Sequence, residues 1–105
     1  MSYVPAFPKP VRLEDPDYLR FIRRQGCLLH PQVAADAHHL EARGVGTKCS
    51  DYRTIPLCRI HHRELHHLGR RRFENVHSVD LPREQFRYLE IYISALKRGV
   101  DLGAK

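Results

Sequence analysis

Cysteine and histidine lie close together in the middle of this chain, in a pattern that a small domain can use in few ways. Cys27 and His30 are separated by two residues, and Cys58 and His61 repeat that spacing. A two-residue spacer lets both side chains of a pair reach one ion from a tight turn, and two such pairs complete a tetrahedral structural zinc site. The pattern therefore predicts one structural zinc, whose binding would also stabilise the fold. The alternative is that both cysteines are buried thiols and both histidines lie at the surface.

Size and charge limit the class of protein. A chain of 105 residues has room for one domain, and its formal charge of +6 favours a polyanionic partner, most often nucleic acid. Three cysteines do not suit a disulfide framework. No apolar run is long enough to span a bilayer, and the proline-rich segment 1–10 lacks the apolar core of a secretory signal. We therefore expect a cytoplasmic protein that binds DNA and no membrane.

Local signals at the N-terminus predict an arm followed by a helix. Three prolines in residues 1–14 favour an extended arm. Asp15 and Pro16 form a helix-start signal, a cap followed by proline at the first helical position. We therefore expect a short helix over residues 15–26.

The central part, residues 27–74, carries alternating strand and helix signals. A tight turn precedes a candidate strand over 33–40, and a glycine-containing loop separates it from a second candidate strand over 52–57. Residues 59–68 contain no helix breaker and end at Gly69, which predicts a helix. The order is strand, loop, strand, helix.

A last helix is predicted over residues 80–98, since Asp80 and Pro82 form a second helix-start signal. Phe86, Leu89, Ile93 and Leu96 recur there at three- and four-residue steps. This spacing places them on one helix face, which we expect to be buried against the domain.

The histidines are unevenly distributed, since all but His77 lie between positions 30 and 67. His38 and His39 are adjacent in the first candidate strand, so one can hold a metal while the other reaches a water if the strand twists or ends there. His62 and His66 are four residues apart on the predicted helix and can bind one ion together. His61 points about 100° away from His62, toward the zinc pairs. The alternative is a histidine-rich zinc-binding surface without catalysis.

This arrangement fits phosphodiester hydrolysis. An imidazole with a pKa near neutrality can accept a proton from an attacking water. A divalent cation beside it can offset the charge that develops on the phosphate and on the leaving oxygen.

The ordered set of motifs resembles the HNH nuclease superfamily, in particular the small HNH proteins of phages and prophages. The set is Asp36-Ala-His-His-Leu40, Gly44-Val-Gly-Thr-Lys48, Ser50-Asp51, Ile55-Pro-Leu-Cys58 and His61-His-Arg-Glu-Leu-His66. The resemblance covers roughly residues 27–74 and implies an α+β fold. It also implies one nuclease domain with a ββα-metal (His-Me finger) core and a zinc knuckle, flanked by the arm, the short helix and the C-terminal helix.

The resemblance also implies roles for individual residues. His38 matches the ligand of the catalytic metal, and His39 matches the general base. His62 follows the second knuckle pair and matches a further ligand, and His66 matches the extra histidine of colicin-type nucleases. The zinc knuckle would consist of four residues, Cys27, His30, Cys58 and His61.

Two features depart from the HNH pattern. Many relatives carry C-x2-C in the first knuckle pair, where this chain has Cys27 and His30, and zinc accepts either pair. The asparagine that orients the base histidine would fall near Arg53, and none is present there. Asp51 or a backbone carbonyl could supply the missing acceptor.

The proposed catalytic ligands, His38, His62 and His66, are all imidazoles. Imidazole suits borderline transition metals, whereas magnesium prefers oxygen ligands. We therefore expect manganese, and also nickel or cobalt, to support activity better than magnesium.

Basic residues surround the predicted site or follow its helix, and most should contact phosphate, with little reading of sequence. They are Arg43, Lys48, Arg53, Arg59, Arg63, Arg70, Arg71 and Arg72. For the run Arg70–Arg72, the alternative is solvated surface charge. One site with one catalytic metal implies that a monomer nicks duplex DNA. The alternative functions are a non-catalytic zinc-binding DNA module and a recombination or packaging accessory that binds a protein partner through its C-terminal helix.

Overall fold

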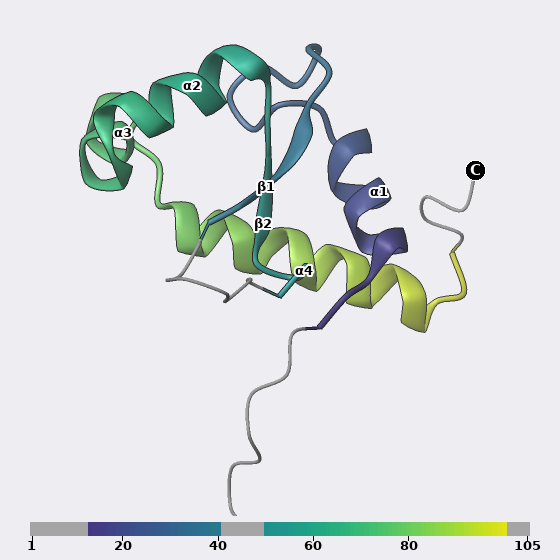
Figure 1. The fold of residues 1–105 in the computed structure, drawn as a ribbon. Coiled ribbons are helices and arrows are strands. Elements are labelled where there is room, and N and C mark those ends of the chain that lie inside the picture. Colours follow the sequence, from purple (N-terminus) through teal and green to yellow (C-terminus); the bar gives the residue numbers. More distant parts are fainter. Residues whose placement is uncertain (1–12, 41–49, 101–105) are drawn as a thin grey trace, which may run out of the picture.

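The computed structural model describes residues 13–40 and 50–100, and within them the chain is a mixed α+β fold (Figure 1). The elements follow in the order α1 (Pro16–Arg24), β1 (Asp36–His39), β2 (Thr54–Leu57), α2 (Arg59–Leu68), α3 (Arg70–His77) and α4 (Leu81–Lys97). The expected α+β class is therefore observed. The expected arm up to residue 12 and the glycine-containing loop at 41–49 lie outside the described residues.

Two of the helices begin at the predicted start signals. The side chain of Asp15 accepts a hydrogen bond from the backbone N–H of Tyr18 at 3.0 Å, and Pro16 follows as the first residue of α1. Asp80 accepts from the N–H of Arg83 at 3.2 Å in the same way at the start of α4. Each cap satisfies a backbone donor that the first helical turn leaves unpaired.

The strands β1 and β2 form an antiparallel pair with a defined register. His38 lies opposite Ile55, and His39 lies opposite Thr54. Both strands are shorter than the sequence predicted. Pro56 is tolerated in β2 because a strand of a two-stranded sheet has one unpaired edge, where no N–H is required.

Buried side chains form two clusters beside the sheet, and the long helix α4 contributes to both. The first joins β2 to α2, α3 and the start of α4, and consists of Cys27, Ile55, Leu57, Cys58, Leu65, Phe73 and Leu81. The second joins α1 to the middle of α4, and consists of Tyr18, Phe21, Ile22, Tyr88 and Tyr92. Ala37 of β1 packs against the second cluster. Since neighbouring residues of a strand point to opposite faces, the flanking His38 faces the other way.

The arginine run that follows α2 begins a helix of its own, which the sequence analysis did not predict. Gly69 has a φ of 83°, which allows α2 to end and α3 to start at once in a new direction. Phe73 is fully buried in the first cluster and anchors α3 to α2.

The predicted buried face of α4 is wrong. Phe86, Ile93 and Leu96 are 60%, 44% and 53% exposed, whereas the residues of α4 that are buried are Leu81, Tyr88, Tyr92 and Ala95. The two tyrosines contact the aromatic side chains of α1, with ring centroids of Tyr92 and Tyr18 4.9 Å apart. This aromatic packing rotates α4 away from the expected orientation. Across the described part of the chain, none of the helices has the length and apolarity needed to cross a membrane.

The turn that carries Cys27 and His30 depends on a glycine, which gives a test of the fold. Gly26 has a φ of +75°, and a Cβ there would lie 2.0 Å from the carbonyl oxygen of Pro31. Gly99 has the same φ of +75°, but a Cβ would meet nothing within 4 Å. We expect Gly26→Ala to lower the free energy of unfolding by roughly 2–4 kcal/mol, and Gly99→Ala by roughly 1 kcal/mol. Urea unfolding measures both, and equal losses would contradict the close approach of Pro31.

Candidate functional site

Three imidazoles converge between β1 and α2. The rings of His38 and His62 have centroids 4.3 Å apart, and those of His38 and His66 are 5.5 Å apart. The Nε2 atoms of His62 and His66 lie 3.0 Å from each other. One ligating nitrogen from each residue lies within 4.8 Å of the other two. A single metal ion can therefore bind all three with small adjustments of the side chains.

The surroundings of His38 and His62 favour the neutral imidazole, which is the form that binds metal. Burial lowers the pKa of His38 to about 4, with further contributions from the nearby imidazoles of His62, His66 and His39. Burial and the neighbouring His66 also lower the pKa of His62, against a smaller raising effect of Asp36.

His39 faces a carboxylate instead of the three imidazoles. Its Nε2 atom lies 3.0 Å from Oδ1 of Asp51, whose side chain is 4% exposed, while the side chain of His39 is 32% exposed. Asp51 is one of the two substitutes for the missing asparagine that the sequence analysis considered. A neutral His39 that donates from Nε2 keeps its Nδ1 lone pair available to accept a proton.

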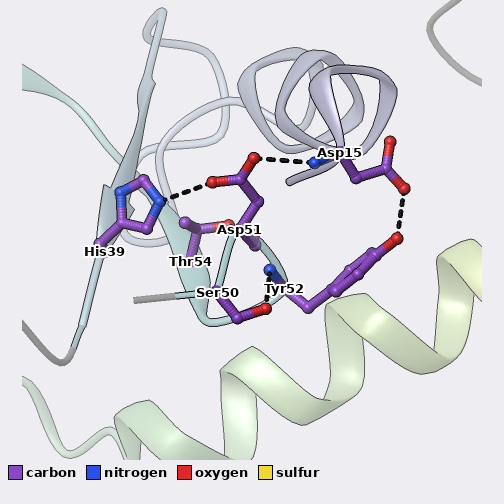
Figure 2. A network of polar contacts seen from close by, with 6 residues as sticks. All are labelled: Asp15, His39, Ser50, Asp51, Tyr52 and Thr54. Atoms are coloured by element: carbon purple, nitrogen blue, oxygen red, sulfur yellow. Dashed lines mark hydrogen bonds and ion pairs between the residues drawn. The ribbon is translucent and has the colours of Figure 1, made fainter. Parts of the chain in front are cut away.

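Asp51 is held by the segment that begins α1 (Figure 2). Its Oδ2 accepts a hydrogen bond from the backbone N–H of Asp15 at 2.8 Å, and its own N–H donates to the carbonyl oxygen of Leu13 at 2.8 Å. The hydroxyl of Thr54 donates to the carbonyl oxygen of Asp51 at 2.9 Å. The Tyr52 hydroxyl donates to Oδ2 of Asp15 at 2.5 Å. These contacts fix the backbone of Asp51 and one carboxylate oxygen, which leaves Oδ1 directed at His39.

The supporting role of Asp15 and Tyr52 was not foreseen from the sequence. Asp15 was predicted only as a helix cap, and it performs that task through Oδ1. Its backbone N–H contacts Asp51, and its Oδ2 contacts Tyr52. Local sequence patterns do not predict contacts between residues so far apart in the chain.

The cysteines gather around His61. Its Nδ1 atom lies 3.4 Å from Sγ of Cys27 and 3.2 Å from Sγ of Cys58. All three residues are buried, and their ligand atoms lie within 4.8 Å of one another. His30 is exposed and lies outside this group, although its ring centroid is 4.7 Å from that of His61. Two thiolates and an imidazole at these distances suit zinc, whereas His30 is not among the residues whose ligand atoms gather there.

The predicted DNA contacts can be located in part. Arg53, Arg59, Arg63 and the run from Arg70 to Arg72 are all exposed. Arg59 and Arg63 project from α2, which also carries His62 and His66. Arg43 and Lys48 lie outside the described residues.

Comparison with known proteins assigns the chain to a family. A family model described as a protein of unknown function, DUF968, matches residues 2–96, and the chain belongs to this family. The family description names no activity, ligand or partner.

A curated relative extends the comparison. The uncharacterized protein YdfU of Escherichia coli (strain K12) is 42% identical over 62 residues, which cover 56% of this chain and 18% of the relative. The matched region is therefore a small part of that longer protein. No solved structure matches the chain.

The contact between His39 and Asp51 can be tested without an activity assay. In Asp51→Asn, one oxygen remains to accept from the N–H of Asp15, and the amide NH₂ then faces Nε2 of His39. We expect the neutral imidazole to move its proton to Nδ1 so that Nε2 can accept this new donor. Long-range ¹H–¹⁵N NMR of the imidazole nitrogens reports the tautomer. The exposed Asp17→Asn is the control, and an unchanged tautomer in Asp51→Asn would show that Asp51 does not set it.

Proposed function

We propose that this protein is a metal-dependent DNA endonuclease of the HNH type, in which β1, β2 and α2 form the ββα-metal core. The observation that carries the proposal is the convergence of His38, His62 and His66 beside a fourth imidazole, His39, that is oriented by a buried carboxylate. The contact between His39 and Asp51 would not be needed in a surface that only binds metal.

The residues of the site divide the chemistry between them. His39 accepts a proton at Nδ1 from a water while the oxygen of that water attacks the phosphorus, and the bond from phosphorus to the leaving oxygen breaks. Asp51 holds the ring in orientation by accepting from Nε2. A divalent cation bound by the three imidazoles would offset the negative charge on the phosphate and the leaving oxygen. Because the described residues contain one such site, each encounter cuts one strand of a duplex.

Two further features support DNA as the substrate. The chain carries a formal charge of +6, and the exposed Arg59 and Arg63 stand on the same helix as two of the proposed metal ligands. Contacts of arginine with phosphate give affinity without selecting a sequence, so we expect weak sequence preference.

The second proposed ion is a structural zinc bound by Cys27, Cys58 and His61, with His30 as the fourth ligand. The three gathered residues connect the turn before β1 to the start of α2. This ion would stabilise the frame from which His62 and His66 project. It would not take part in hydrolysis.

The general base gives the most direct test of the proposed activity. His39→Ala should reduce the nicking of supercoiled plasmid in manganese by about 10²–10⁴-fold, because proton transfer contributes on that scale. His67→Ala is the matched control, since His67 is exposed on α2 and outside the groups of potential metal ligands found in the described residues. DNA binding and zinc content should be unchanged in both variants. If His39→Ala cuts as fast as the parent protein, the chain is better described as a non-catalytic zinc-binding DNA module.

The ligand set predicts the metal preference. With three imidazoles and no carboxylate, nicking should be faster in manganese, nickel or cobalt than in magnesium at matched concentrations. His66→Asp supplies an oxygen ligand and should lower the ratio of the manganese rate to the magnesium rate. Equal rates in the two metals for the parent protein would argue against this ligand set.

A further inference from the structure

The neighbours of His61 form two groups, and only those of the zinc knuckle had been expected. A second group of potential ligands consists of His61, Glu64 and His77, whose nearest ligand atoms also lie within 4.8 Å of one another. Nε2 of His77 lies 2.5 Å from Oε1 of Glu64, and the ring of His77 is perpendicular to that of His61 with the centroids 5.4 Å apart. No role was assigned to Glu64 or His77 from the sequence.

The helices place this pair beside His61. Glu64 lies one turn after His61 on α2, so both side chains project from neighbouring parts of the helix surface. His77 is the last residue of α3, and its ring centroid is 4.6 Å from that of the buried Phe73. The side chains of Glu64 and His77 are 35% and 22% exposed, so the contact is partly shielded from water.

The two nitrogens of His61 have different surroundings. Nδ1 points at both sulfur atoms, at 3.4 Å from Cys27 and 3.2 Å from Cys58, and is the nitrogen that zinc would take. Nε2 then carries the proton. Histidines that bind a metal commonly donate the remaining N–H to a carboxylate, which fixes the ring and increases its basicity. Glu64 is the carboxylate that groups with His61 among the described residues, and its contact with Nε2 of His77 restrains it.

We infer that Glu64, held by His77, is a positioning residue of the zinc site and accepts the Nε2–H of His61 when zinc is bound. This inference rests on the zinc centre of the proposed function, but it does not depend on nuclease activity. It extends the zinc site from the turn before β1 through α2 to the end of α3. The orientation of α3, which carries Arg70, Arg71 and Arg72, would thereby depend on the metal.

Zinc affinity tests the inference. We expect Glu64→Ala to weaken zinc binding by about tenfold or more, the usual loss when an outer partner of a ligand is removed. Glu64→Gln should recover most of this loss, because the carboxamide oxygen still accepts a hydrogen bond. Glu90→Ala, at an exposed glutamate of α4, is the control and should bind zinc as the parent does. Competition with a chromophoric chelator measures all four proteins.

Cobalt spectroscopy separates positioning from packing. In the cobalt-substituted protein, Glu64→Ala should shift the absorption bands that report the ligand field, while Glu90→Ala should leave them unchanged. Parental zinc affinity in Glu64→Ala would overturn the inference. A second outcome would also overturn it: Glu64→Gln loses as much zinc affinity as Glu64→Ala, and the cobalt spectrum of Glu64→Ala is unchanged. The contact between Glu64 and His77 would then serve only to join α2 to α3. If the parent protein binds no zinc, the zinc centre itself is wrong, whereas a failure to nick DNA with normal zinc binding leaves the inference standing.

Discussion

The register between β1 and β2 decides where every histidine of the first strand points. Opposite residues of an antiparallel pair share a face of the sheet. His38 and Ile55 therefore lie on the face toward α2, and His39 and Thr54 lie on the other face. A slip of one residue would exchange the two faces and turn His38 away from His62 and His66. The register is held because both faces are covered: Ile55 is buried in one cluster, and Ala37 packs against the aromatic residues of the other. The two clusters thus fix the geometry of the site as well as the fold.

Helix α2 connects two potential metal centres because consecutive residues of a helix diverge by about 100°. His61 is turned toward the cysteines, while the next residue, His62, is turned toward His38. Two ions can therefore be held by adjacent histidines without sharing a ligand. A rotation of the helix would displace both centres together, which makes the anchoring of α2 through the buried Leu65 important for each of them.

Elements with local signals could be predicted from the sequence, and elements that depend on distant partners could not. Aspartate followed by proline marked the starts of α1 and α4, and Gly69 marked the end of α2. Helix α3 was missed because a run of arginines carries no apolar periodicity and its burial rests on Phe73 alone. Helix α4 offers two apolar stripes with helical spacing, and its contacts with α1 and β2 decide which is buried. The spacing of the histidines and cysteines predicted which side chains could meet, whereas the contacts of Asp51 required the fold.

The use of aspartate at position 51 follows from the number of donors that meet there. The N–H of Asp15 and Nε2 of His39 both approach the carboxylate, one at each oxygen. A carboxylate can accept from both, whereas a carboxamide has one oxygen and would present an NH₂ group to one of them. The carboxylate of Asp51 therefore accepts the backbone N–H of Asp15 just before α1, and it also orients the ring of His39. Because Asp15 is also the cap of α1 and is bound by Tyr52, the position of His39 depends on the packing of the N-terminal helix as well as on its own strand.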